Sequence, residues 1–252
     1  MSEDQPYLFS PYRMRDVTAR NRLWIAPMCM YSVFAEDGVP TDWHLVHLGS
    51  RAVGGAGLII VEATGVEPRG RISAHDLGLW NDAQAEAFEP IVHFLKEHGS
   101  VPAVQLAHAG RKAGVPGAIA PSPLPISSQY AIPQEMTLAD IGQVIDAFRG
   151  ATRRALAAGF QAVEIHSAHG YLLHEFLSPI SNRREDVYGG SFENRTRLLL
   201  EVVRAMRDIW PEQLPLFVRI RATDRVPGGW DVDPSVVRAR LLTPEGAALV
   251  GC

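Results

Sequence analysis

Short apolar segments alternate with amphipathic helical segments along most of this chain, and no other feature restricts the fold as strongly. Six apolar runs have the length and composition of buried strands: residues 23–28, 57–63, 101–107, 162–166, 214–220 and 247–250. Strands that alternate with helices form a parallel sheet, because each right-handed crossover places its helix over one face. The sequence therefore predicts an α/β fold.

Three helices can be read from their periodicity and their ends. Residues 81–98 carry an apolar stripe and are followed by Gly99, which stands where a C-terminal cap belongs. A second helix begins at Thr137, which forms a capping box with Asp140, and its buried stripe continues to Gly159. A third runs from Ser191 to about Trp210. Each predicted helix lies between two predicted strands, as a parallel sheet requires.

Two architectures fit this alternation, an open doubly wound sheet and a (β/α)8 barrel. The first predicted strand does not lead into the glycine-rich turn of a nucleotide-binding doubly wound fold. Polar residues instead follow five successive strands, and barrel enzymes collect their chemistry at these ends: Cys29 and Tyr31, residues 62–64, Gln105 and His108, His166 and His169, Arg219 and Arg221. We therefore predict one domain, residues 1–252, with a TIM (β/α)8-type barrel of about six of eight βα units, lacking the last two.

Composition excludes two classes of partner. The formal net charge is −4 and the pI is about 6.1, so the chain has no basic excess for nucleic acid. No apolar run approaches the roughly 20 residues that span a bilayer, so no membrane partner is expected. The two cysteines, Cys29 and Cys252, are too few for a disulfide framework and fit a reducing compartment. A cytoplasmic protein is expected.

Three segments carry a resemblance to a known family. Residues 21–32 read NRLWIAPMCMYS, residues 105–112 read QLAHAGRK, and residues 164–179 read EIHSAHGYLLHEFLSP. In this order they resemble the thermophilic-like branch of the old yellow enzyme family, and the resemblance extends from residue 7 to about residue 250. It implies an FMN-dependent NADPH dehydrogenase, or ene-reductase, that uses NADPH or NADH to reduce activated alkenes such as enones, enals or nitro compounds. Dimers and tetramers are common in this branch, so the oligomeric state stays open.

The same resemblance implies roles for individual residues. Arg219 is expected beside the N1/O2 edge of the flavin, where a fixed positive charge stabilises the negative charge of the reduced ring. Gln105 is expected to hydrogen-bond the pyrimidine edge. The remaining flavin contacts that the resemblance implies are Ala26, Pro27, Met28, Cys29 and Ala63.

The substrate residues follow from the third segment. His166 and His169 are expected to donate hydrogen bonds to the carbonyl or nitro oxygen of the substrate, which stabilises the developing enolate. Tyr171 is expected to protonate the α-carbon as a general acid. Tyr31 is expected to help close the substrate pocket. No metal ligand is implied.

Two alternatives remain open at this stage. Three nearby histidines, His166, His169 and His174, could instead form a metal site for hydrolysis. The chain could also be a truncated, weakly active or inactive remnant that acts as an interaction module through open sheet edges. Family members continue beyond the position of Cys252, Arg221 stands where the family usually has a small residue, and Pro244 interrupts the end of a helix.

Overall fold

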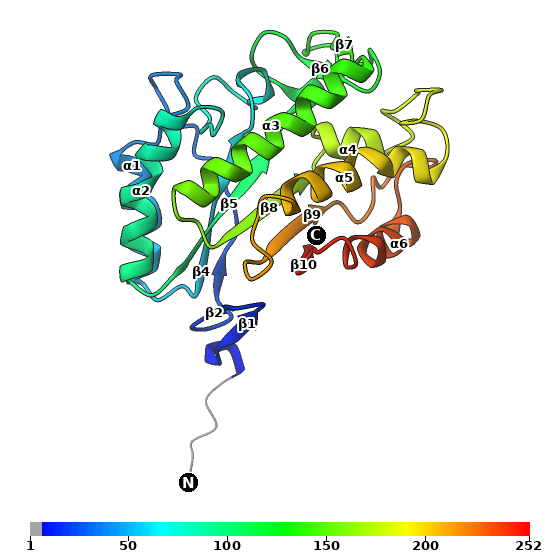
Figure 1. The fold of residues 1–252 in the computed structure, drawn as a ribbon. Coiled ribbons are helices and arrows are strands. Elements are labelled where there is room, and N and C mark those ends of the chain that lie inside the picture. Colours follow the sequence, from blue (N-terminus) through cyan, green and yellow to red (C-terminus); the bar gives the residue numbers. More distant parts are fainter. Residues whose placement is uncertain (1–6) are drawn as a thin grey trace.

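The computed structural model describes residues 7–252 and contains a six-stranded parallel sheet with helices over one face (Figure 1). The strands occupy the sheet in chain order: β3 (Trp24–Ile25), β4 (Leu58–Gly65), β5 (Val101–Ala107), β8 (Ala162–Ser167), β9 (Leu216–Ile220) and β10 (Leu249–Gly251). Within the described residues β3 and β10 are the two edges and do not pair with each other. The predicted α/β class and an incomplete barrel of about six units are confirmed.

Among the described residues, six α-helices connect or follow these strands. They are α1 (Asp42–Val53), α2 (Asp82–Glu97), α3 (Leu138–Ala157), α4 (Leu172–Leu177), α5 (Phe192–Arg207) and α6 (Val232–Leu242). The three predicted helices correspond to α2, α3 and α5. Thr137 caps α3 by accepting a hydrogen bond from the Asp140 amide, as predicted, and Gly99 has a positive φ of 74° after α2. Within residues 7–252, no helix has both the length and the apolarity that crossing a membrane requires.

Alternate residues of the strands supply two separate apolar clusters, because successive side chains point to opposite faces of a sheet. Val104, Val163 and Val218 belong to the larger cluster, which also contains Phe88 of α2 and Phe148 of α3. This cluster fills the space between the sheet and the helices. It forms the main core of the described chain.

The smaller cluster lies on the inner face of the curved sheet. There Ala103, Ala162 and Phe217 pack with residues of a hairpin formed by β1 (Tyr12–Met14) and β2 (Val17–Ala19). The hairpin lies beyond the starting ends of the strands (Figure 1). It covers the bottom of the half-barrel, so the opposite ends of the strands remain available for a site.

Several element boundaries differ from the predictions. The first strand is confined to Trp24–Ile25, since only these two residues pair with β4. Strand β4 continues to Gly65 through an irregularity in register between Val61 and Ala63, which the sequence pattern does not indicate. The remaining short elements are η1 (Tyr7–Phe9), η2 (Pro68–Gly70), η3 (Gly110–Lys112), β6 (Ile119–Ala120) and β7 (Gln134–Glu135).

Candidate active site at the carboxyl ends of the strands

The inner face of the sheet changes from apolar to polar toward the carboxyl ends of its strands. On β8, the apolar Ala162 is followed on the same face by Glu164 and then His166, all buried. The register places Gln105 of β5 beside Glu164 and Arg219 of β9 beside His166. A polar layer therefore lies directly above the apolar inner cluster.

Gln105 and Glu164 are joined across this layer. The Gln105 amide donates a 2.7 Å hydrogen bond from Nε2 to Oε1 of Glu164. Burial raises the pKa of Glu164, while this hydrogen bond and the charge of Arg219 oppose the rise. On the opposite edge of β5, Gln105 is the register partner of Ala63 in β4. Glu164 was not predicted as a site residue, although its spacing from His166 already indicated the inner face.

His166 and His169 form a contacting pair at the mouth. The two rings approach to 3.2 Å between Nε2 of His166 and Nδ1 of His169. The Ala168 amide donates to Nδ1 of His166 over 3.3 Å, so Nε2 carries the proton of the neutral ring. Burial lowers the pKa of His166 well below its usual value, and the charges of His169 and Arg219 lower it further. The pKa of His169 is also lowered, chiefly by burial. Both rings are neutral donors at pH 7.

Two of the predicted site residues have left-handed backbone conformations. His169 has φ 59° and Tyr31 has φ 52°, in a region that costs a non-glycine residue about 1–2 kcal/mol. Among residues 7–252 only five non-glycine residues have positive φ. Such strain persists where the surrounding structure fixes it and is concentrated at functional sites.

Tyr171 completes the cluster at the start of α4, where it is the N-cap residue. Its ring lies edge-on to His166, with centroids 5.0 Å apart and planes at 84°. The ammonium of Lys112 lies 4.8 Å from the ring centroid. Burial raises the pKa of the Tyr171 phenol above its usual value, and Cys29 and Tyr31 raise it further. The phenol is therefore protonated at neutral pH.

The segment after β3 forms the opposite wall. Ala26 and Pro27 line a cavity of about 200 Å³ together with Glu164 and Arg219. Cys29 is half-buried, and burial raises the pKa of its thiol to about 12, with Glu62 and Asp76 adding to the effect. The residue is therefore a thiol and not a thiolate at neutral pH.

Met28 does not line the cavity that contains Arg219, although it shares a smaller space with Ala26. Its side chain is 53% exposed and lines a small space with His44 and Glu62 beside α1. Glu62 holds this segment in place, because its Oε2 accepts a 2.8 Å hydrogen bond from the Met30 amide. Burial raises the pKa of Glu62 to about 7. The register irregularity in β4 coincides with this residue, while Ala63 keeps its pairing with Gln105.

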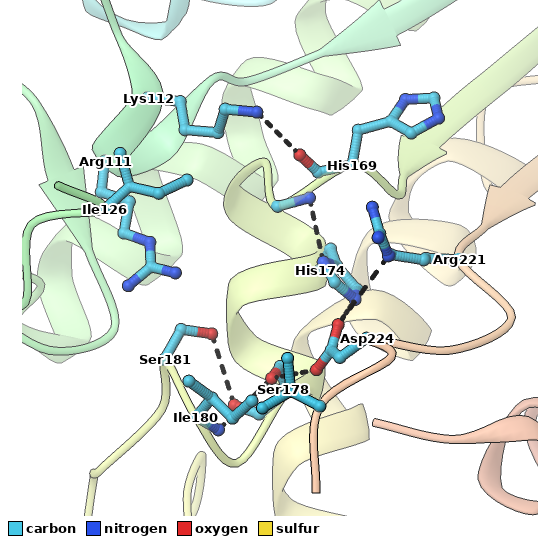
Figure 2. A pocket seen from close by; sticks show the side chains of 12 residues that line it. Arg111, Lys112, Ile126, His169, His174, Ser178, Ile180, Ser181, Arg221 and Asp224 are labelled. Carbon is cyan, nitrogen blue, oxygen red and sulfur yellow. Dashed lines mark hydrogen bonds and ion pairs between the residues drawn. The ribbon is translucent and has the colours of Figure 1, made fainter. Parts of the chain in front are cut away.

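A second cavity, of about 360 Å³, lies beside His169 (Figure 2). His174 does not join the histidine pair: its Nδ1 accepts from the Gly170 amide at 3.0 Å, and its Nε2 faces Asp224 Oδ1 at 3.2 Å. No group of three or more His, Cys, Asp or Glu residues between 7 and 252 could hold a metal ion. The three histidines of the metal hypothesis are therefore not brought together.

Several residues of this second cavity were not predicted to have functional roles. Lys112 lies within a segment that the resemblance already included, so its position could have indicated a role. Ser178 lies in another such segment, but Asp224 gave no sequence signal, because it meets Ser178 only through the packing of the loop after β9 against α4.

Comparison with known proteins gives consistent matches. The model of a family described as NADH:flavin oxidoreductase / NADH oxidase matches residues 7–240. An NADPH dehydrogenase of Geobacillus thermodenitrificans is 52% identical over 244 residues, covering 96% of this chain and 71% of that protein. The solved structure of an old yellow enzyme homologue from Zymomonas mobilis has a TM-score of 0.86 and 33% identity, covering 97% of this chain and 72% of that chain. Morphinone reductase, solved with tetrahydroNAD, has a TM-score of 0.85 and 31% identity, covering 97% and 73%.

Proposed function

Because the chain belongs to the NADH:flavin oxidoreductase / NADH oxidase family, we propose that it reduces the C=C bond of activated alkenes in an FMN-dependent reaction with NADPH or NADH. The family expected from the sequence is confirmed, and with it an oxidoreductase class that uses flavin. One observation carries the finer proposal: the neutral His166–His169 pair lies beside the protonated Tyr171 at the mouth of the half-barrel.

The residues of the mouth fit a flavin ring. Ala26 and Pro27 offer a small apolar wall, and Arg219 adds a cation to the same cavity. Gln105 lies on the inner face of the neighbouring strand β5, where its amide suits a polar ring edge. Bound FMN would supply hydride transfer from the nicotinamide donor to the β-carbon of the alkene. Arg219 stabilises negative charge on the ring, because a guanidinium stays protonated at every working pH.

The histidine pair supplies the polarising donors. In this tautomer the Nε2–H of His166 is directed at Nδ1 of His169, and the neutral His169 keeps its Nε2–H for a ligand. A substrate oxygen that replaces the contact between the rings would accept from both Nε2–H groups. Two N–H groups directed at one substrate oxygen stabilise the negative charge that forms there as the alkene is reduced. Because the Ala168 amide holds the ring of His166 and this ring packs edge-on against His169, little reorganisation is needed during the reaction.

Tyr171 is the group that delivers a proton. The Oη proton is available at neutral pH because burial raises the pKa of the phenol. In the proposed reaction this proton moves to the α-carbon of the alkene, and solvent later restores it. The partners of the protein are then small activated alkenes and a nicotinamide, without nucleic acid or membrane, and we place this reaction in the cytoplasm.

An isotope experiment tests the proposal. The protein is supplied with FMN, cyclohexenone and NADPH carrying deuterium at the transferred position, and the product is examined by mass spectrometry and NMR. We expect donor deuterium at the β-carbon and, in heavy water, solvent deuterium at the α-carbon. A fully FMN-loaded protein that oxidises the nicotinamide with oxygen but leaves the alkene intact would overturn the proposed substrate class.

The alternative of an inactive remnant is not favoured by the site. His166, His169 and Tyr171 are all present and in mutual contact, and Arg219 is the register partner of His166. A chain retained only for its sheet edges would not need this arrangement.

A further inference from the structure

Three cationic side chains surround the cavity beside His169 (Figure 2). Arg111 and Lys112 come from η3, just after β5, and Arg221 follows β9. Among residues 7–252, no carboxylate lies within ion-pair distance of the side chains of Arg111 or Lys112, and Arg221 approaches only Asp224, at 4.0 Å. Segments far apart in the sequence therefore bring positive charge to one opening.

The two acidic groups near this cavity do not cancel the charge. Glu175 is fully buried, and burial raises its pKa to about 8, so it is mainly neutral at pH 7. Asp224 is ionised but engaged: Ser178 Oγ donates to its Oδ2 at 2.6 Å, and the Trp230 amide donates to the same atom at 2.8 Å. Its other oxygen faces His174. The cavity keeps an excess of positive charge.

The cations also retain hydrogen-bond donors. The Arg111 Nε is buried without a partner among the described residues, and its Nη1 makes only a long contact of 3.3 Å to the Leu124 carbonyl. Arg221 uses Nε for the Thr223 carbonyl at 2.8 Å, which leaves the two Nη groups for another acceptor. Lys112 donates to the His169 carbonyl at 3.0 Å and has further N–H groups. An oxyanion would satisfy several of these donors at once.

We propose that this cavity binds an oxyanion, a phosphate or a carboxylate, carried by the molecule whose reactive part meets His166 and His169. The proposal rests on the proposed function, since His169 lines both the cavity and the catalytic cluster. Two sources share this chemistry: the phosphates of the nicotinamide donor and a carboxylate on the alkene. The second would make the preferred substrate an acidic enone.

Direct anion binding is the first test, because it needs neither flavin nor turnover. Inorganic pyrophosphate is titrated into the protein and followed by calorimetry and by the NMR signals of the histidine rings. We expect saturable binding that shifts the His169 and His174 signals and weakens as salt is added. Arg221→Ser should weaken binding about tenfold or more, as expected for the loss of one charge-assisted contact.

Two variants make this result decisive. Arg225→Ser changes the same charge in the same loop, but Arg225 is exposed and does not line the cavity, so binding should match the wild type. Lys112→Met removes a second cation and should also weaken binding, which covers the case of an Arg221 variant that fails to fold. If Arg221→Ser and Lys112→Met both bind pyrophosphate as tightly as Arg225→Ser does, the proposal is overturned.

The source of the anion is separated by half-reactions of the FMN-loaded protein. If the rate of flavin reduction in Arg221→Ser falls more with NADPH than with a neutral benzyl-dihydronicotinamide, this result assigns the cavity to the nicotinamide donor. A larger loss with a carboxylate-bearing enone than with cyclohexenone assigns it to the alkene. Equal losses with charged and neutral reactants contradict the inference. If the protein reduces no alkene but still binds pyrophosphate in a manner that depends on Arg221, only the proposed function is refuted.

Discussion

His166 on β8 and Arg219 on β9 are register partners, so a buried imidazole lies beside a permanent cation. Burial lowers the pKa of His166, and Arg219 lowers it further, because protonation would place a second positive charge beside the guanidinium. The neutral ring still donates through Nε2. The pair therefore couples the proposed flavin-binding wall to the substrate-binding histidines.

Removal of this imidazole should affect alkene reduction directly. We expect His166→Ala to lower kcat/KM for an enone by roughly 100-fold or more, as measured for the loss of a single oxyanion donor. His93→Ala is the matched control, since His93 is 72% exposed on α2, far along the chain from the site. The assay is steady-state alkene reduction by gas chromatography. A loss below about tenfold would be incompatible with an oxyanion role.

Tyr171→Phe separates proton delivery from electron transfer. We expect alkene reduction to fall by about 100-fold or more, while reduction of a quinone, which needs no proton on carbon, is much less affected. Because the pKa of the phenol is raised, the proton stays in place as the pH increases, and no alkaline loss from this group is expected up to pH ~9. Equal losses for alkene and quinone would argue against the general-acid role.

Glu175 should make the stability of the fold depend on pH. Its pKa is raised from 4.5 to about 8 in the folded protein, so the folded state holds this proton more tightly than the unfolded chain. Its contribution is therefore fully present below about pH 4.5 and is lost as the pH rises toward 8. Between pH 5 and 8, the free energy of unfolding should fall less for Glu175→Gln than for the wild type, as measured by urea denaturation at each pH. Parallel pH profiles of the two proteins would disprove this assignment.

Arg238 is expected to destabilise α6 and its surroundings. Its guanidinium is buried, none of its three nitrogens has a hydrogen-bond partner among residues 7–252, and burial lowers its pKa to about 9. The guanidinium lies 5.9 Å from the centroid of the Phe192 ring, but a buried charge without hydrogen-bond partners still costs more than an apolar side chain of similar volume. Arg238→Met should therefore stabilise the fold by about 1–4 kcal/mol, measured by thermal unfolding. Arg240→Met, on the same helix, is the control, and a lower melting temperature for Arg238→Met alone would contradict this reasoning.

The periodic parts of the fold could be predicted from sequence. Strand β5 and the cap of α3 at Thr137 match their expected positions, because local apolar patterning and capping determine them. Helix α4 could not be predicted, since six residues give no periodicity and its place depends on the packing of the β8–α4 loop. The hairpin β1–β2 was missed for a related reason: its strands have three residues each.

The site followed the same division. The proximity of His166, His169 and Tyr171 could be predicted, because all three lie in the short segment of the family resemblance that follows a predicted strand. The contact of Gln105 with Glu164 depends on strand register, and the approach of Arg221 to Lys112 depends on how two loops pack. Neither of these two relationships can be predicted from the residues that neighbour it in the sequence. The predicted roles of all the site residues, including Met28 and Cys29, stay predictions.

Titration of the purified protein with FMN tests the central claim most directly. Arg219 lines the cavity that Ala26 and Pro27 also line, so its guanidinium is expected to contribute to the affinity for the flavin ring. We expect saturable binding by flavin fluorescence, weakened about tenfold by Arg219→Met and unchanged in Arg225→Met. A folded, monodisperse sample that does not bind FMN would contradict the proposed flavin-dependent reaction.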